Sequence, residues 1–287
     1  MKAAVCRDYK SPLFIEDVVL DSPLENEIEV TLKASAICHS DISSMDGVWY
    51  DKLPAIYGHE ASGYVTKIGA KVDTFNLGDK VLVTLIRSCN ACAACIDLDP
   101  TSCNFNWNDE YTPLSNTSGE KFVRGIKVGA FAEKVVVQES QCVKLPDDIP
   151  FDVASLLACG VITGFGSVKN SAKLSEGQTA MVFGCGGVGL NALQGAKFNL
   201  ASKIIAVDIS ETKLRIAKMF GATHCILGNS NNLKDQVMEL TDGDGVDYVF
   251  ITVGVGKLFE DSVKYLKKGG TAVLVGMPPS QDSLIPY

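Results

Sequence analysis

Four cysteines lie close together in the first half of the chain and carry its clearest chemical signal. Their spacing is C-x2-C-x2-C-x7-C, at Cys89, Cys92, Cys95 and Cys103. One loop of this length can place four thiolates around a tetrahedral zinc ion, and such a closed shell leaves no position for a substrate. The spacing therefore predicts a structural zinc site, with an iron–sulfur cluster as the main alternative.

A glycine-rich run in the second half has the residues needed to bind a dinucleotide. Gly184-Cys185-Gly186-Gly187-Val188-Gly189 follows an apolar segment and precedes a helical pattern. In this context the G-x-G-x-x-G spacing lets a pyrophosphate approach backbone N–H groups at the start of a helix. Asp208, nineteen positions after Gly189, ends the next apolar segment, where a carboxylate can bind ribose hydroxyls and repel a 2′-phosphate. The pattern predicts NAD rather than NADP; the alternative is a glycine loop that serves packing alone.

The elements around this run alternate between apolar strands and amphipathic helices. Strands are expected over 179–183, 203–207, 225–227, 248–253 and 271–275. Helices are expected after Gly189 and over 211–220, 233–240 and 257–266. This rhythm predicts an α/β fold with a doubly wound parallel sheet of about five strands.

The first half is instead rich in short β-strand patterns broken by turns. Strands are expected over 2–5, 27–33, 63–68, 80–85 and 132–137. We therefore predict a β-rich domain over residues 1–150 and a second domain over 151–287. The segment 150–173 would connect them, with a helix around its apolar Val153 to Leu157 run.

Composition restricts the class of function. The chain has 287 residues, 46% of them hydrophobic and 21% charged, which is enough for two folded cores. A net charge of -8 and a pI near 5.0 argue against a general affinity for nucleic acid or for an anionic membrane. The N-terminus has no signal-peptide pattern, so a cytoplasmic protein that binds a small molecule is expected, and its cysteines indicate metal or redox chemistry rather than disulfides.

A further motif identifies a family resemblance. Residues 58–72 run Gly-His-Glu-Ala-Ser-Gly-Tyr-Val-Thr-Lys-Ile-Gly-Ala-Lys-Val, which is similar to the zinc signature G-H-E-x2-G-x5-G-x2-V of the medium-chain zinc-dependent alcohol dehydrogenases. The four-cysteine lobe and the glycine loop follow in that family's order. The resemblance covers essentially the whole chain and implies a GroES-like first domain, a Rossmann-type second domain, two zinc ions per chain and NAD.

The resemblance also implies a catalytic zinc site that spacing alone does not reveal. Cys38, His59 and Cys159 match its three ligands, and a fourth position stays open for water or for the substrate oxygen. The zinc would lower the pKa of an alcohol, whose hydride passes to the nicotinamide. Asp41 matches a carboxylate that holds the His59 ring, and Glu60 an acidic neighbour that tunes the zinc environment.

Other positions match residues that move the proton or contact the cofactor. Ser40 matches the hydroxyl that takes the alcohol proton and passes it outward. His39 lies where the family places a residue near the pyrophosphate, and could extend this proton path. Three more positions match cofactor contacts, beside the nicotinamide, on its ring and at the adenosine ribose: Thr163, Val188 and Lys213.

The chain departs from this family in length. Family members continue for roughly another quarter of this length, which adds a sixth strand and a return segment to the first domain. We therefore expect a C-terminally truncated member, with a naturally short or split protein as the alternative. A homodimer or homotetramer is the family expectation.

Substrate and activity are the least determined properties. Trp49 and Leu85 are candidate wall residues of the substrate pocket and favour a primary or aromatic alcohol, or the corresponding aldehyde, over a polyol. The absence of basic residues between Cys103 and Asn116 disfavours a glutathione adduct. The competing hypothesis is a non-catalytic remnant or subunit that binds NAD and zinc. A third possibility, a zinc-free relative of the quinone reductases, would leave the match of Cys38, His59 and Cys159 unexplained.

Overall fold

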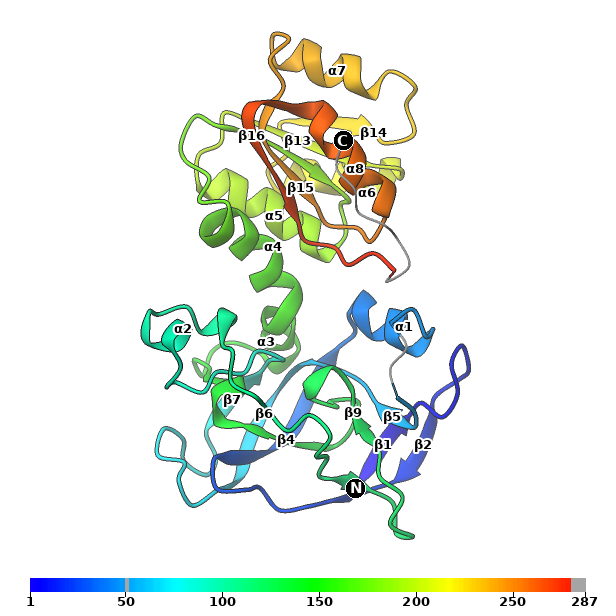
Figure 1. Ribbon diagram of the computed structural model, residues 1–287, viewed down its shortest axis with the longest axis vertical. Coiled ribbons are helices and arrows are strands. Elements are labelled where there is room, and N and C mark those ends of the chain that lie inside the picture. The colour runs from blue at the N-terminus through cyan, green and yellow to red at the C-terminus, as the bar shows by residue number, and fades with distance from the viewer. Residues whose placement is uncertain (50–51, 280–287) are drawn as a thin grey trace. The chain divides into compact units, whose positions relative to one another are not determined.

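The computed structural model describes residues 1–49 and 52–279 (Figure 1). Contacts divide the chain into two compact units, Met1–Cys159 and Gly160–Tyr287. Each unit has its own buried hydrophobic clusters. Residues 280–287 of the predicted second domain lie outside the described residues.

A five-stranded antiparallel sheet forms the centre of the first unit. Its strand order is β10-β4-β6-β7-β11. The strands are β4 (Glu27–Ala36), β6 (Glu60–Ile68), β7 (Lys80–Val83), β10 (Lys134–Gln138) and β11 (Cys142–Lys144). Because side chains alternate between the two faces of a strand, Val30, Val81 and Val135 can pack in one buried cluster. The β-rich first half expected from the sequence is confirmed.

Shorter elements surround this sheet. Three small strand pairs are β1 (Lys2–Val5) with β2 (Phe14–Asp17), β3 (Val19–Leu20) with β8 (Leu114–Ser115), and β5 (Ala55–Ile56) with β9 (Val123–Arg124). Two short helices, α1 (His39–Met45) and α2 (Ala93–Ile96), lie outside the sheet (Figure 1). Single 3₁₀ turns occur at Pro100–Ser102, Gly125–Lys127 and Glu139–Gln141.

The second unit is built on a five-stranded parallel sheet of order β14-β13-β12-β15-β16. Its strands are β12 (Thr179–Phe183), β13 (Lys203–Asp208), β14 (His224–Leu227), β15 (Val246–Ile251) and β16 (Leu266–Leu274). The intervening helices are α5 (Gly187–Phe198), α6 (Glu211–Met219), α7 (Leu233–Leu240) and α8 (Gly256–Asp261), the last continued by a 3₁₀ turn at Ser262–Tyr265. Numbered within this unit, the strand order is 3-2-1-4-5, that of a Rossmann-type nucleotide-binding sheet. The predicted doubly wound fold is confirmed.

Both faces of this parallel sheet are covered by helices. On β12, Val182 packs with Leu193 of α5 in one buried cluster. The adjacent Met181 packs with Val237 of α7 and Phe259 of α8 in another. This arrangement explains why the strands of this half read as continuous apolar runs.

A helical run joins the two units and places the boundary later than predicted. It consists of α3 (Phe151–Leu156), a π-helical turn at Leu157–Val161, α4 (Ile162–Gly166) and a second such turn at Ser167–Ser171. The ring of Phe151 packs edge-on against Tyr64 of β6, and the Ala158 carbonyl accepts a hydrogen bond from Thr84. These contacts tie the start of the run to the first unit, so the units separate after residue 159 rather than after residue 150.

This run, Phe151–Ser171, is also long and apolar enough to cross a membrane by length and composition alone. Core helices of globular proteins pass the same test. Ala154 and Ala158 are fully buried within the first unit, and Val168 belongs to a buried cluster of the second. The start of the run therefore contributes to the core of the first unit, and its end to the core of the second.

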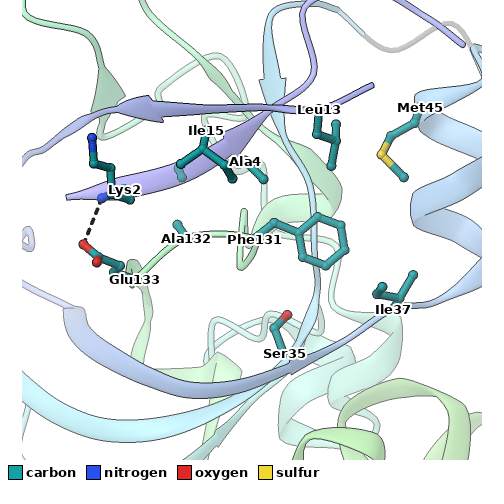
Figure 2. Close-up of a pocket in the computed structure, with 11 residues that line it drawn as sticks. Lys2, Ala4, Leu13, Ile15, Ser35, Ile37, Met45, Phe131, Ala132 and Glu133 are labelled. Carbon is teal, nitrogen blue, oxygen red and sulfur yellow. Dashed lines mark hydrogen bonds between the residues drawn. The ribbon is translucent and has the colours of Figure 1, made fainter. Parts of the chain in front are cut away.

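An apolar hollow of about 440 Å³ lies in the first unit (Figure 2). Leu13, Ile15, Ile37, Met45 and Phe131 supply most of its apolar side chains, and Lys2 and Glu133 are joined by a hydrogen bond at one side. The described residues that line it include none of the predicted site residues.

Candidate functional site

The four clustered cysteines converge around one point. Cys92 and Cys95 lie at α2, and Cys103 follows the 3₁₀ turn at Pro100–Ser102. The sulfur of Cys95 lies 4.0 Å from that of Cys89 and 3.5 Å from that of Cys92, whose own sulfur lies 3.9 Å from that of Cys103. Four sulfurs at about 2.3 Å from a tetrahedral zinc would be about 3.8 Å apart. The sulfur positions therefore fit a zinc ion.

The electrostatics of this loop favour a deprotonated sulfur at Cys92 and a protonated one at Cys95. Hydrogen bonds from the backbone N–H groups of Cys95 and Asn104 lower the pKa of Cys92 to about 6. Desolvation and the hydrogen bond with Cys92 raise the pKa of Cys95 to about 11. Neighbouring thiolates repel each other, so a bound cation is what would let all of them ionise together.

A second group of possible metal ligands comes from three distant parts of the first unit. The ligand atoms of Cys38, His59, Glu60 and Cys159 all lie within 4.8 Å of one another. Cys38 directly precedes α1, and Cys159 lies in the π-helical turn. His59 directly precedes β6, and Glu60 is its first residue. Two thiolates and an imidazole are ligands that zinc prefers, and a carboxylate is a fourth acceptable one. The fold thus brings together the three residues that the resemblance identified.

Asp41 fixes the orientation of the histidine in this group. The carboxylate is fully buried, and its Oδ1 lies 3.0 Å from His59 Nδ1 and accepts a hydrogen bond of 2.9 Å from the Gly58 N–H. Its Oδ2 accepts a hydrogen bond of 3.0 Å from the Cys38 N–H. An Nδ1–H bonded to Asp41 leaves Nε2 as the metal-binding nitrogen. One carboxylate therefore positions two candidate ligands.

The same contacts shift the pKa values of the two ligands in opposite directions. Hydrogen bonds from Cys159, His59 and Ser40 lower the pKa of Cys38 to about 3 despite its burial. Burial lowers the pKa of His59, but hydrogen bonds with Asp41 and Cys38 outweigh this and raise it to about 9. The Cys38 sulfur is thus held as a thiolate, the form that binds a metal.

The two residues expected to handle the proton differ in their exposure. Ser40 is half-buried in the first turn of α1, and its hydroxyl contacts the Cys38 sulfur. His39, the first residue of the same helix, is exposed. Glu60 is buried next to His59, with an exposed fraction of 4%. The order from half-buried Ser40 to exposed His39 is compatible with an outward proton path.

The glycine run forms the turn between β12 and α5 in the second unit. Gly184 has a φ of +91°, which favours glycine, and a Cβ on Gly189 would lie 1.8 Å from the Gly184 carbonyl oxygen. In contrast, a Cβ on Gly186 or Gly187 would meet nothing within 4 Å, and no described side chain caps the helix at Gly186. The fold therefore requires glycine at 184 and 189. The absence of side chains at Gly186 and Gly187 instead leaves open space beside helix N–H groups, which fits a pyrophosphate.

Asp208 lies beside this turn at the end of β13. It is 8% exposed, and its Oδ2 accepts a hydrogen bond of 2.8 Å from the Cys185 N–H while Oδ1 accepts one of 2.9 Å from the Ser210 N–H. Each carboxylate oxygen has a further lone pair for a ribose hydroxyl. The carboxylate is therefore held in one orientation and retains acceptor capacity.

Three of the other predicted cofactor residues lie in the same unit, whereas His39 lies in the first unit. Val188 is half-buried in the first turn of α5, and Thr163 is half-buried in α4. Gly164 packs so closely on α5 that a Cβ there would lie 2.1 Å from the Val188 carbonyl oxygen. Lys213 is exposed in the first turn of α6.

One residue at this turn was not expected from the sequence. Thr252 follows β15 directly, and its Oγ1 donates to the Phe183 carbonyl at 2.9 Å and lies 3.1 Å from the Gly184 carbonyl oxygen. A single threonine after an apolar run carries no motif. Only the pairing of β15 with β12 places it beneath the glycine turn.

Comparisons with known proteins bear on both sites. Residues 24–147 match the alcohol dehydrogenase GroES-like domain, and residues 187–287 match the zinc-binding dehydrogenase family. S-(hydroxymethyl)glutathione dehydrogenase from Saccharomyces cerevisiae is 34% identical over 98% of this chain and 77% of its own length. Alcohol dehydrogenase-like 2 from Arabidopsis thaliana is 36% identical over 96% of this chain and 75% of its own length.

Solved structures agree with these relatives. Benzyl alcohol dehydrogenase from Acinetobacter calcoaceticus superposes with a TM-score of 0.91 and 29% identity, over 100% of this chain and 79% of that one. An alcohol dehydrogenase zinc-binding domain protein from Burkholderia ambifaria gives a TM-score of 0.92 and 31% identity over the same shares. Such a family implies zinc and a nicotinamide dinucleotide as cofactors.

Proposed function

Because the chain belongs to the zinc-dependent alcohol dehydrogenases and is an oxidoreductase of that kind, we propose that it transfers a hydride between a primary or aromatic alcohol and NAD. The product of oxidation is an aldehyde or a ketone. The observation that carries this proposal is the convergence of Cys38, His59 and Cys159, with Asp41 behind the histidine.

In this proposal each of the two cysteine-containing groups binds one zinc ion. Cys38, His59 and Cys159 hold the catalytic zinc, and the four clustered cysteines hold the structural zinc. When bound, the catalytic zinc lowers the pKa of the alcohol and NAD accepts the hydride. Asp41 keeps the His59 ring in the ligating orientation, and Glu60 adds negative charge beside it.

The proton released from the alcohol leaves through α1. Ser40 both accepts and donates through its hydroxyl, so it can take the proton from the substrate oxygen and pass it on. His39 is exposed and can exchange a proton with solvent.

The cofactor proposed is NAD. Gly186, Gly187 and Val188 offer backbone N–H groups to the pyrophosphate, and Asp208 accepts from the ribose hydroxyls. A 2′-phosphate would bring a second negative charge against Asp208, which disfavours NADP. Lys213 and Thr163 complete the set as proposed contacts of the adenosine ribose and of the nicotinamide.

The substrate class follows from the relatives and from the composition of the zinc lobe. The benzyl alcohol dehydrogenase similarity favours an aromatic alcohol. The S-(hydroxymethyl)glutathione dehydrogenase similarity makes a glutathione adduct the second candidate, although no basic residue lies between Cys103 and Asn116 to bind its carboxylates. Benzyl alcohol, ethanol and S-(hydroxymethyl)glutathione therefore form the diagnostic panel.

The test combines three measurements on one preparation of the full chain. Zinc per chain by elemental analysis, NADH fluorescence titration and turnover on the panel are compared for the wild type, Cys38→Ser and Cys225→Ser. Cys225 is a control because it lies on β14 of the second unit and belongs to neither group of candidate ligands. We expect two zincs, saturable NADH binding and turnover in wild type and control, with one zinc and no turnover in Cys38→Ser. A wild type with one zinc and no turnover would instead support a non-catalytic remnant.

Assembly and location remain proposals. We propose a homodimer or homotetramer in the cytoplasm, as the sequence led us to expect. Light scattering during size-exclusion chromatography measures the assembly directly.

A further inference from the structure

Thr252 makes two contacts with the glycine turn that the proposed mechanism does not use. Its backbone N–H donates to the Phe183 carbonyl at 3.0 Å, which continues the pairing of β15 with β12. Its hydroxyl donates to the same carbonyl at 2.9 Å and lies 3.1 Å from the Gly184 carbonyl oxygen, so one hydrogen is shared between two acceptors. A Cβ on Gly184 or on Gly189 would lie 2.9 Å or 3.0 Å from this hydroxyl oxygen. The hydroxyl is thus packed between the two glycines that the turn requires.

The peptide between Gly184 and Cys185 transmits this contact across the turn. In a trans peptide the C=O and N–H point in opposite directions. The Gly184 carbonyl faces Thr252, while the Cys185 N–H donates to Asp208 Oδ2 at 2.8 Å. The Gly184 N–H in turn donates to the Val207 carbonyl at 2.8 Å. The turn is therefore held from β15 on one side and from β13 on the other.

This chain of contacts has a consequence for the dinucleotide site. If the Gly184 carbonyl lost its partner on the β15 side, the peptide could rotate and the Cys185 N–H would turn away from Asp208. The carboxylate would lose the bond that orients it, and the following N–H groups of Gly186 and Gly187 would shift with the turn.

We propose that Thr252 is a positioning residue for the dinucleotide, whose hydroxyl sets both the direction of the pyrophosphate-facing N–H groups and the orientation of Asp208. The inference rests on the proposed binding of NAD to this turn. It assigns a role in cofactor affinity and in NAD preference to a residue whose hydroxyl contacts two backbone carbonyls at this turn.

The experiment uses Thr252→Val, which keeps the shape and removes the hydroxyl, and Thr252→Ser, which keeps the hydroxyl. NADH and NADPH dissociation constants are measured by fluorescence titration of the full chain, with Tm for each variant. Thr179→Val is the matched control, because Thr179 lies at the opposite end of β12 and bonds Asp247 at 2.8 Å through its hydroxyl. We expect Thr252→Val to bind NADH about tenfold more weakly, as for the loss of one buried hydrogen bond, and to discriminate less against NADPH.

The controls separate positioning from general stability. Thr252→Ser is expected to restore wild-type NADH binding, and Thr179→Val to lower Tm while leaving the NADH dissociation constant unchanged at a temperature where it is folded. Unchanged NADH binding in a folded Thr252→Val would overturn the inference. If the wild type itself fails to bind NADH, the proposed function fails rather than the role of Thr252. If Thr252→Val does not fold, Thr252→Ser becomes the test. The assignment to the hydroxyl is then overturned if Thr252→Ser loses NADH affinity while Thr179→Val keeps the wild-type NADH dissociation constant.

Discussion

Asp41→Asn tests whether a buried carboxylate organises the candidate catalytic zinc site. Asp41 accepts from the His59 ring, the Gly58 N–H and the Cys38 N–H at 2.9 to 3.0 Å. An asparagine side chain has one acceptor oxygen and one NH₂ donor, so it cannot serve all three donors. If the NH₂ takes the place of Oδ1, it forces the ring proton of His59 onto Nε2 and leaves the Gly58 N–H without an acceptor. If it takes the place of Oδ2, it leaves the Cys38 N–H without an acceptor.

The loss of zinc affinity and the loss of folding stability expected from the substitution can both be estimated. Loss of the group that orients a metal-bound histidine weakens metal binding about 10- to 100-fold. This corresponds to about 1.4–2.8 kcal/mol, at about 1.4 kcal/mol per factor of ten. Either arrangement also leaves one backbone N–H unpaired, that of Gly58 or of Cys38, at a cost of about 1–3 kcal/mol in the free energy of unfolding. The four-cysteine site contains no contact to Asp41 among the described residues and should retain its zinc.

The assay is competition for zinc with a colorimetric chelator, followed by elemental analysis. Two release phases are expected for the wild type, and only the phase assigned to Cys38, His59 and Cys159 should move in Asp41→Asn. Asp46→Asn is the matched control, because Asp46 is exposed at the C-terminal end of the same helix. If both zinc ions of Asp41→Asn resist the chelator as strongly as those of the wild type, the assigned role of Asp41 is refuted.

The same variant has a pH signature. Although burial lowers it, hydrogen bonding to Asp41 and Cys38 raises the pKa of His59 to about 9, so zinc uptake near pH 7 must displace a proton from the imidazolium. Zinc affinity of the wild type should therefore rise as the pH rises toward 9. In Asp41→Asn the pKa of His59 falls, and this dependence should be weaker over the same interval.

Three further predictions address the turn, the zinc lobe and the central sheet. Gly186→Ala should weaken NADH binding, measured by titration, without changing Tm, because its Cβ meets only open space. Gly189→Ala should lower the free energy of unfolding by about 1–3 kcal/mol, measured by thermal unfolding, because its Cβ clashes with the Gly184 carbonyl oxygen. Cys92→Ser should remove one zinc per chain by elemental analysis and lower Tm, while NADH binding persists. Burial raises the pKa of Glu29, but hydrogen bonds from two lysines and a threonine outweigh this and hold it below the ordinary 4.5, so its stabilisation is present above that pH and is lost as the pH falls through the lowered pKa. Glu29→Gln should accordingly lower the free energy of unfolding by about 1–3 kcal/mol at pH 7 and flatten the acid limb of a stability curve measured by denaturant unfolding.

The features that sequence alone determined are those encoded within a short stretch of chain. The four cysteines at 89–103 can reach one ion because a loop of that length has little freedom to place them elsewhere. The glycine turn at 184–189 follows from a strand, a helix and the spacing between them. Strands such as 179–183 and the helix 233–240 were predictable because their periodicity reflects which faces are buried.

Tertiary structure decided what depends on pairing between distant segments. Cys38, His59 and Cys159 are separated by many residues, and only the arrangement of α1, β6 and the π-helical turn brings their ligand atoms within 4.8 Å. The family resemblance identified these three residues as zinc ligands, but no local spacing in the sequence shows that they lie together. The boundary after residue 159 likewise depends on the packing of α3 against the first unit's sheet, and a helical pattern in the sequence does not record which partner it packs on. Thr252 is the clearest case, since its role follows from the register of β15 on β12, and register is a property of paired strands rather than of either strand.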